Sequence, residues 1–387
     1  MRIRLKIRRG FCLLAAGLCL LGTALAGEAE LKEKRLELGG SYLSYQTVAG
    51  MEEETLQQQV NSRIAEDLRI QEFVARMNAL ISDEKYHLTA KGSALLEGEV
   101  YSAVLEAEGA VQSLRGTHLW AWSNIDLRDG HEITLGELFP EAEAAREALE
   151  DYLEEYVAEE LSAHLENCEL TPLPEGFWLE KTGLTLLYPA EQLSTLSSRA
   201  GAVKIGWNEI REWTDWSEDG IPARIGAADM VTLTESSTAK IREMTEIGQL
   251  PDIPVKLGDS VQELTDACHL LNDPDEYAGG RMFSPEGAAF RNVFILSDAV
   301  SAKWDQSRVQ GIRMDRGCAW GLCIGETEQD TWHRLLGEPD HTVAFDEDSA
   351  EAYRTVPGTC DYYEFGDHTL QLYSDESGLL ISITLAE

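Results

Sequence analysis

A repeated motif in the C-terminal half constrains the fold of this chain more than any other sequence feature. Residues 257–263 (LGDSVQE) are echoed by residues 324–330 (IGETEQD). Each copy continues into a helical segment with a Leu-Leu pair and a Pro-Asp pair, and ends on an alternating segment, 309–314 or 379–385. Because each unit combines one helix with a small meander, we expect the two copies to share one antiparallel sheet.

The repeat also bears on the motif Gly258-Asp259-Ser260. Ser260 would be the nucleophile in a lipase-like interpretation, but Thr327 occupies the equivalent position in the second copy. Each hydroxyl is followed three residues later by an acid, which is typical of a helix N-cap. We therefore predict that Ser260 and Thr327 cap helices, since a nucleophile would be needed in one copy only and also requires a base.

The first half of the chain has the pattern of an α+β domain. Apolar residues at three- and four-residue steps predict a long helix over residues 52–81 and a second over 142–165. Asp129-Gly130 predicts a hairpin turn, with residues 132–135 returning as a strand. Further strands are expected at 42–48, 100–106, 118–127, 177–179, 184–188 and 203–205. Two long helices among antiparallel strands predict an α+β fold.

These patterns divide the chain into four parts. We expect a signal peptide at 1–26, an extracytoplasmic α+β domain at 27–216, a linker at 217–250 and a tandem-repeat domain at 251–387. The repeats would span about 251–315 and 319–387. Turn-rich pieces at both ends mark the linker. Its central stretch could add a strand to either neighbour.

The N-terminus reads as an export signal. Five basic residues precede the apolar run 11–21, and Ala26 ends a small-residue cleavage site. The run is shorter than the roughly 20 residues that cross a bilayer. An uncleaved anchor and, more weakly, a lipoprotein at Cys19 stay open. The chain is therefore expected to be secreted or retained at the cell surface.

Charge restricts the partners. The chain has 32 Lys+Arg and 69 Asp+Glu, a net charge of −37, and removal of the signal with its five basic residues leaves 27 − 69 = −42. Such a surface repels nucleic acid and anionic lipid. A cationic protein or peptide, or a neutral ligand, is the easier partner. The other interpretation is that the acidity serves solubility alone.

No pattern commits the chain to a cofactor, a metal or catalysis. With so many acids, a glycosidase-type carboxylate pair cannot be identified from sequence. No histidine pair has metal-helix spacing, and no phosphate-binding loop follows a strand, so no cofactor is expected. The cysteines after the signal are odd in number, which leaves both one disulfide and buried free thiols open. They are Cys168, Cys268, Cys318, Cys323 and Cys360.

Four tryptophans are the candidate partner-binding residues. Trp120 and Trp122 share one face of an expected strand, while Trp213 and Trp216 lie near the end of the first domain. Tryptophan is enriched at binding hot spots. It also fills cores or covers their edges, so a structural role is the alternative for all four residues.

The first half also carries an ordered set of motifs. They are YLSY at 42–45, NIDLxxG at 124–130, ITLGELF at 133–139, FxLxxxGLTLLYP at 177–189 and VxI at 203–205. This order resembles the extracellular module of RsiV-type lysozyme-binding anti-sigma factors, which also precedes the catalytic domain of some peptidoglycan deacetylases. The resemblance implies a non-catalytic binding or sensing module, some members of which bind lysozyme. The C-terminal repeats resemble beta-lactamase-inhibitor-like and SmpA-like envelope proteins.

Together these patterns predict an exported binding or sensing protein for a cationic protein such as lysozyme, or for another envelope partner. Two alternatives remain. One is a cell-wall or glycan hydrolase with an unidentified carboxylate pair, and the other is a structural protein of envelope assembly.

Overall fold

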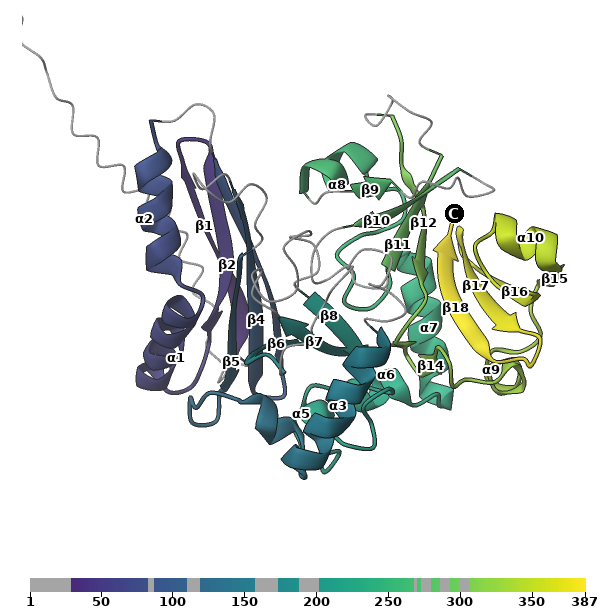
Figure 1. Ribbon diagram of the computed structural model, residues 1–387, viewed down its shortest axis with the longest axis horizontal. Helices are drawn as coiled ribbons and strands as arrows, with labels where there is room; N and C mark the ends of the chain where they lie inside the picture. The colour runs from purple at the N-terminus through teal and green to yellow at the C-terminus, as the bar shows by residue number, and fades with distance from the viewer. Residues whose placement is uncertain are drawn as a thin grey trace, which may run out of the picture.

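The computed structural model describes residues 29–82, 87–109, 119–156, 173–187, 202–267, 270–272, 280–285, 293–298 and 306–387. The signal peptide and its cleavage site at Ala26 lie outside these residues. The fold is mixed α+β with several antiparallel sheets, as the sequence predicts (Figure 1). In the described residues no helix is long and apolar enough to cross a membrane.

The N-terminal sheet has five strands in chain order. All neighbours are antiparallel except β2 and β3, which are parallel. A parallel pair needs a crossover connection, and helices α1 (Glu54–Asp67) and α2 (Ile70–Leu80) provide it. The strands are β1 (Glu30–Leu38), β2 (Ser41–Ala49), β3 (Leu88–Glu97), β4 (Val100–Gly109) and β5 (Leu119–Asp126).

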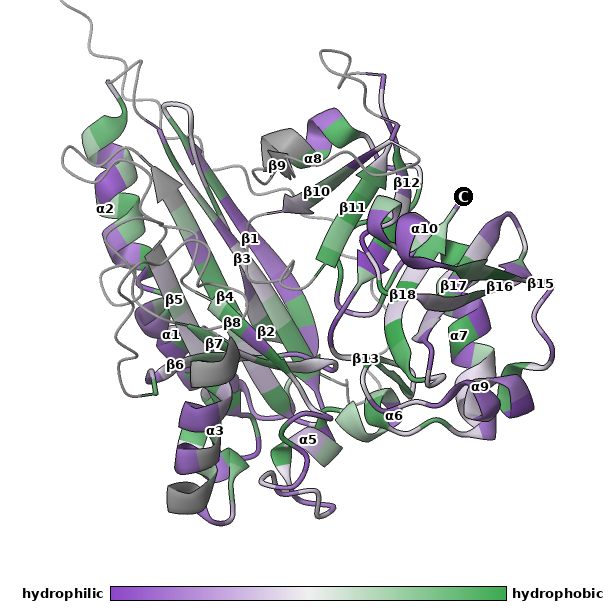
Figure 2. Ribbon diagram, turned by 45° about the vertical axis from the view of Figure 1, so that its right-hand side comes forward, coloured by the Kyte–Doolittle hydropathy of each residue, from purple (hydrophilic) through white to green (hydrophobic). Residues whose placement is uncertain are grey.

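The predicted single helix over 52–81 is two helices. Arg69 has a left-handed backbone (φ 55°) and separates α1 from α2. Both helices bury their apolar residues against one face of the sheet, including Ile64, Phe73 and Met77. Figure 2 shows hydrophobic and hydrophilic residues alternating around both helices. The break at Arg69 allows the apolar faces of α1 and α2 both to pack on the sheet.

A small sheet packs against the other face of the five-stranded sheet. It consists of β6 (Gly176–Leu179), β7 (Gly183–Leu187) and β8 (Ala202–Gly206), all antiparallel and fully buried. Helix α3 (Ala142–Tyr156) covers part of the same core. The remainder of the predicted helix 142–165 lies outside the described residues.

The predicted return strand at 132–135 is wrong in its extent. A single bridge joins Glu132 to Ile125. The chain then turns into a 3-10 helix, Leu135–Leu138, whose Thr134 and Glu137 form a capping box. The Thr134 hydroxyl and backbone N–H donate to Glu137 Oε1 at 2.9 Å each, which ends the strand and begins the helix.

Three helices occupy residues 217–250, where the sequence predicted a linker with a possible strand. They are α5 (Ile221–Arg224), α6 (Ala227–Val231) and α7 (Glu235–Ile247). The apolar residues of α5 and α6 belong to the core beneath β6–β8, and those of α7 belong to the core of the C-terminal sheet. This segment is therefore a packed connection between the two halves.

The two repeats form one eight-stranded antiparallel sheet, as predicted. The order β15-β16-β17-β18-β12-β11-β10-β9 places the last strand of each repeat at the centre, where β12 pairs with β18. The first repeat has α8 (Val261–Ala267), β9 (Leu270–Asn272), β10 (Arg281–Pro285), β11 (Val293–Ser297) and β12 (Val309–Met314). The second has α9 (Gln329–Leu336), β15 (His341–Phe345), α10 (Glu347–Ala352), β16 (Gly358–Phe365), β17 (His368–Asp375) and β18 (Leu380–Ala386).

The hydrogen bonds show the equivalence of the two copies. Gly258 N donates to Val309 O and Gly325 N donates to Leu380 O, both at 2.8 Å, and both glycines have φ +82°. Ser260 directly precedes α8, and its hydroxyl accepts a long bond, 3.4 Å, from Glu263 N. In this respect the first copy has the expected cap.

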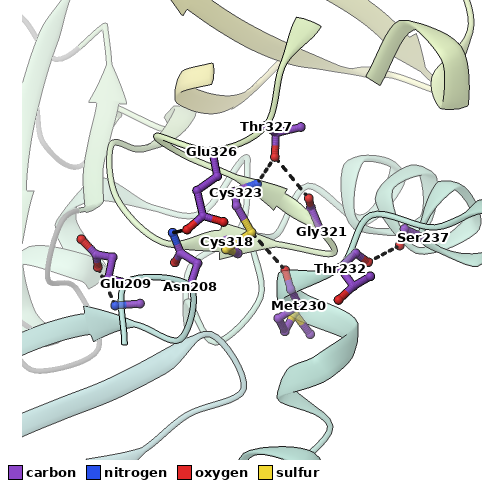
Figure 3. Close-up of a disulfide and its surroundings, with 11 residues drawn as sticks. Asn208, Glu209, Met230, Thr232, Ser237, Cys318, Gly321, Cys323, Glu326 and Thr327 are labelled. Atoms are coloured by element: carbon purple, nitrogen blue, oxygen red, sulfur yellow. Dashed lines mark hydrogen bonds between the residues drawn. A yellow bond between two sulfur atoms is a disulfide. The ribbon is translucent and has the colours of Figure 1, made fainter. Parts of the chain in front are cut away.

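Thr327 does not cap a helix, which corrects the prediction. Glu328 is the N-cap of α9, because the second copy has one more residue before its helix. Thr327 instead accepts a hydrogen bond from Cys323 N at 2.7 Å and donates to Gly321 O at 3.4 Å (Figure 3). Its role is to close a hairpin that lies between the repeats.

That hairpin consists of β13 (Cys318–Ala319) and β14 (Leu322–Cys323), and a disulfide joins Cys318 to Cys323. Gly321 N donates to Met230 O of α6 at 2.7 Å, which ties the hairpin to the connecting helices. Figure 3 shows Glu326 reaching Asn208 of the first half, at 3.1 Å. Cys360 is buried and free, while Cys168 and Cys268 lie outside the described residues.

Candidate functional site

A pocket of about 480 Å³ lies in the first half of the chain. We call it the Trp122 pocket. It forms where β5, the turn before the 3-10 helix, α3 and the entry to β6 meet. Its lining is Trp122, Asn124, Glu132, Ile133, Thr134, Leu135, Gly136, Phe139, Arg146, Leu149, Leu173, Pro174, Glu175 and Phe177. Aromatic and aliphatic side chains predominate, as in most ligand pockets.

Buried hydrogen bonds fix the floor of this pocket. Asn124 Nδ2 donates to Phe177 O at 2.9 Å, while its Oδ1 accepts from Ser102 at 2.6 Å. Ser102 Oγ accepts in turn from Leu179 N at 2.8 Å. These bonds join β4 and β5 to β6, so Asn124 holds the two sheets together and its amide is occupied.

Gly176 leaves room for the Trp122 ring. A Cβ at Gly176 would lie 2.8 Å from ring atoms of Trp122, closer than real contacts allow. Trp122 is half-buried. Its ring therefore covers the backbone of β6 and also borders the pocket, so that the glycine determines how the tryptophan lies.

Charged residues surround the apolar lining. Glu132, Glu175 and Arg146 are exposed. Glu132 pairs with Arg63 of α1 at 2.5 Å, and Arg146 pairs with Glu150 at 3.0 Å. Because Glu132 and Arg146 are paired, the charge of Glu175 makes the pocket edge acidic beside the apolar lining.

His131 lies next to the pocket between two acids. Its Nδ1 is 2.6 Å from Asp129 Oδ1 and its Nε2 is 3.0 Å from Glu137 Oε2. These hydrogen bonds, first to Asp129 and then to Glu137, raise the pKa of His131. The imidazole thus favours its charged form, and its two hydrogen bonds join Asp129 of the turn to Glu137 of the 3-10 helix.

The other three candidate tryptophans, Trp120, Trp213 and Trp216, pack against hydrophobic clusters of the protein. Trp120 shares a face of β5 with Trp122, as predicted, but is 9% exposed and packs on Trp178. Trp213 and Trp216 pack on a different cluster, below β6–β8. Trp216 meets Trp207 edge-to-face at 6.3 Å and donates from Nε1 to Arg211 O at 3.0 Å. The four residues therefore do not form one surface.

Sequence reasoning missed the charged rim and a second site. Glu180 and Lys204 pair at 3.2 Å, both almost fully buried. Their signal was a single acid after the apolar run 177–179 and a single base within the apolar run 203–205. Among the described residues, no group of three or more His, Cys, Asp or Glu side chains is placed to hold a metal ion.

Comparisons with known proteins identify structural neighbours only. No protein-family model matches the chain, and no curated protein matches its sequence. Similar solved structures include two DUF3298 family proteins, the group that contains RsiV-like extracellular domains. The one from Bacteroides fragilis is 16% identical with a TM-score of 0.36, covering 51% of this chain and 96% of its own. The one from Pseudomonas aeruginosa is 12% identical with a TM-score of 0.33, covering 49% and 94%.

A DUF4309 family protein from Bacillus subtilis is also similar. It is 10% identical with a TM-score of 0.25, and the match covers 40% of this chain and 97% of that one. These scores are too low to support an argument about function.

Proposed function

We propose that this chain is an exported, non-catalytic binding protein, and that the Trp122 pocket recognises a cationic protein such as a lysozyme or another basic envelope partner. The observation that carries the proposal is the pocket itself. It combines an apolar, aromatic lining with an acidic edge, on a chain whose net charge is −37.

The apolar part of the pocket supplies affinity. Trp122 is half-buried and offers aromatic surface, while the buried rings of Phe139 and Phe177 line the pocket from the core. The hydrogen bonds of Asn124 fix the strands that carry Trp122 and Phe177. Preformed aromatic sites of this kind are typical hot spots of protein interfaces. A partner could insert one aliphatic or aromatic side chain, or the stem of an arginine, without reordering the site.

The charge of the chain supplies attraction over distance. A strongly acidic surface accelerates the approach of a basic partner, and added salt weakens this acceleration. Glu175 at the pocket edge would face basic residues that flank the inserted side chain. Export, predicted from residues 1–26, would place the protein where such partners occur.

Binding of hen lysozyme to the purified protein tests the proposal. We expect saturable binding that persists at about 0.15 M salt, where the screening length is roughly 8 Å. Trp122→Ala should weaken it at least tenfold, about 1.4 kcal/mol, because a hot-spot aromatic is lost.

Trp216→Ala is the matched control. It removes another half-buried tryptophan, from the cluster below β6–β8, and should leave the affinity within twofold. Thermal unfolding of both variants checks that they fold. The proposal fails if no binding is seen even at low salt, or if both variants bind as the unaltered protein does.

A further inference from the structure

Strand β15 forms one edge of the eight-stranded sheet, and among the described strands it pairs with β16 alone. It lies at the outer end of this sheet, on the side away from the five-stranded sheet (Figure 1). Its residues from His341 to Ala344 are all exposed. We call this surface the β15 edge. An edge strand presents a row of unpaired N–H and C=O groups that can pair with another chain.

The register shows which backbone groups of β15 face outward. Tyr362 O accepts a hydrogen bond from Asp340 N at 2.8 Å, so the backbone of Tyr362 points toward β15. Its register partner His341 therefore points toward β16, and successive residues of the strand alternate in this respect. Thr342 and Ala344 thus direct their N–H and C=O groups away from the sheet. Nothing in the described part of the chain bonds to these four groups.

The neighbouring elements hold this edge in place. Thr342 Oγ1 donates to Asp361 Oδ1 at 2.6 Å, and the buried Asp361 also accepts from Gln329 of α9 at 2.9 Å. His341 stacks on Tyr362, with the ring centroids 4.1 Å apart. The strand is therefore preformed, and a partner segment would not have to order it on binding.

The composition of β15 differs from that of β1, the edge strand of the five-stranded sheet. Proteins commonly protect exposed edges with charged side chains, especially lysine. β1 (ELKEKRLEL) follows this rule, with Lys32, Lys34 and Arg35 between its acids. β15 (HTVAF) has no Lys, Arg, Asp or Glu, and Val343 is one of the exposed large hydrophobic residues. The β15 edge thus lacks the side chains that keep β1 from pairing.

Acidic residues flank the β15 edge at both ends. Two precede the strand and three directly follow it, all of them exposed: Glu338, Asp340, Asp346, Glu347 and Asp348. Residues 335–353 contain no Lys or Arg. An uncharged strand between negative ends favours a basic partner segment. Pairing with β15 of a second copy would instead bring two acidic segments together, which disfavours self-association.

We propose that the β15 edge binds an extended, basic segment of a partner protein, which adds to the C-terminal sheet as a further strand. The backbone of this segment exchanges hydrogen bonds with Thr342 and Ala344, and its basic side chains face the acids at the two ends. In complexes of this kind the main-chain bonds give affinity and the side chains give specificity. The Trp122 pocket lies in the other half of the chain, so the proposal stands independently of the proposed function.

A peptide of alternating lysine and valine, acetyl-Lys-Val-Lys-Val-Lys-amide, is the probe. Fluorescence anisotropy at low salt measures its affinity for the full protein, and we expect a Kd below about 1 mM. The same peptide with glutamate for lysine should bind roughly tenfold more weakly or worse, because its charges are repelled. The lysine peptide N-methylated at every amide should lose a similar factor, because it keeps its charge but cannot donate to the strand.

Hydrogen exchange shows where the peptide binds. The N–H of Ala344 points outward, whereas that of Val343 bonds to β16. Bound peptide should therefore slow the exchange of the Ala344 amide about tenfold and change that of Val343 little. If saturating peptide leaves the Ala344 amide as fast as before, the peptide does not pair with β15 and the proposal is wrong.

A matched pair of variants tests the same hydrogen bond from the side of the protein. Ala344→Pro removes an outward donor, and proline is tolerated on an edge strand where its missing N–H would face solvent. It should weaken the lysine peptide roughly tenfold, while Ala344→Val keeps the N–H and should stay within about twofold. Thermal unfolding checks both variants. If Ala344→Pro does not fold, the N-methylated peptide still tests the main-chain contacts.

A second pair of variants tests the charges. Glu338→Gln/Glu347→Gln removes one acid from each end of the strand and should weaken the lysine peptide several-fold at low salt. Glu52→Gln/Glu53→Gln removes two exposed acids of the first half and should bind as the unaltered protein does. Equal binding of the lysine, glutamate and N-methylated peptides would overturn the proposal. A folded Ala344→Pro that binds as tightly as Ala344→Val would overturn it as well.

Discussion

At the scale of single residues, the motif NIDLxxG at 124–130 is a set of structural contacts. Asn124 joins two sheets. Asp126 is buried and takes two hydrogen bonds from Arg224 of α5, at 2.7 and 3.1 Å, as well as bonds from Arg128. Gly130, with φ +80°, makes the turn. The motif therefore marks where the first half of the chain is held together.

The first prediction concerns Asp126. Asp126→Asn should lower the free energy of unfolding by about 3–5 kcal/mol, because Arg224 keeps its charge in a buried site without a carboxylate. Urea unfolding at neutral pH measures this. Asp129→Asn is the control, since Asp129 and its partner His131 are both exposed and such surface pairs contribute little to stability. Equal losses in the two variants would contradict the argument.

The same carboxylate predicts an acid limit of stability. Burial alone would raise the pKa of Asp126, but the hydrogen bonds from Arg128 and Arg224 outweigh it and hold that pKa well below its ordinary value. A depressed folded pKa adds stability that is fully present above the unfolded value of about 3.9, and this stability is lost as pH falls below it. The difference between Asp126→Asn and the unaltered protein should therefore shrink below pH 4.

At the scale of elements, two glycines at the disulfide hairpin share a backbone conformation, but only one of them lies close to another segment of the chain. Gly317 and Gly321 both have left-handed backbones, φ +86° and +88°. A Cβ at Gly317 would meet nothing within 4 Å, whereas a Cβ at Gly321 would lie 2.3 Å from the backbone of Leu233. The two glycines therefore share one conformational requirement and differ in their surroundings.

This pair gives the second prediction. Gly317→Ala should cost about 1–3 kcal/mol, the strain of a left-handed alanine. Gly321→Ala should cost clearly more, because the hairpin must also move away from α6 and lose the bond from Gly321 N to Met230 O. Thermal unfolding under non-reducing conditions compares them. If the two variants lose equal stability, the contact with Leu233 has no energetic weight.

Elements also show what the sequence could and could not predict. The shared sheet could be predicted because the repeat is visible in short stretches of sequence. Its glycines, strand ends and helix starts recur in the same order in both copies. The long helix was predicted without its break, although the step of five from Leu68 to Phe73 disturbs the three-four spacing. The helices of 217–250 were missed because α7 buries Ser237 and Thr245, polar residues that obscure its apolar face.

The candidate sites likewise include one residue that the sequence could predict and one pair that it could not. Trp122 was a predicted binding residue and lines a pocket, because an aromatic on a strand face is visible in the sequence. The buried pair of Glu180 and Lys204 was not predictable. The two residues are 24 positions apart in the sequence, and they meet only when β6 and β8 are brought together by folding.

At the scale of the whole molecule, the two halves share a core. The cluster below β6–β8 contains residues of the first half together with Ile221, Ile225 and Val231, and the disulfide cysteines also join it. Arg224 reaches back to the turn between β3 and β4, donating to Gly98 O at 3.1 Å. The expected end of the first domain at residue 216 therefore cuts through a packed core.

The last prediction tests this shared core by truncation. A fragment of residues 27–216 should be far less stable than one of residues 27–233, because it loses Ile221, Ile225 and Val231, each worth roughly 1.5–3 kcal/mol when fully buried. It also leaves Asp126 with the hydrogen bonds from Arg128 alone, so the acid limit described above should be weaker in this fragment. Urea unfolding of both fragments, with the full protein as reference, measures the difference.

The longer fragment still lacks the disulfide hairpin, so it should unfold at lower urea than the full protein. Adding Asp126→Asn to each fragment then isolates the link between the halves. The variant should cost several kcal/mol in 27–233, where Arg224 is present, and much less in 27–216. If 27–216 unfolds at the same urea concentration as 27–233, α5 and α6 are dispensable and the first half is a domain on its own.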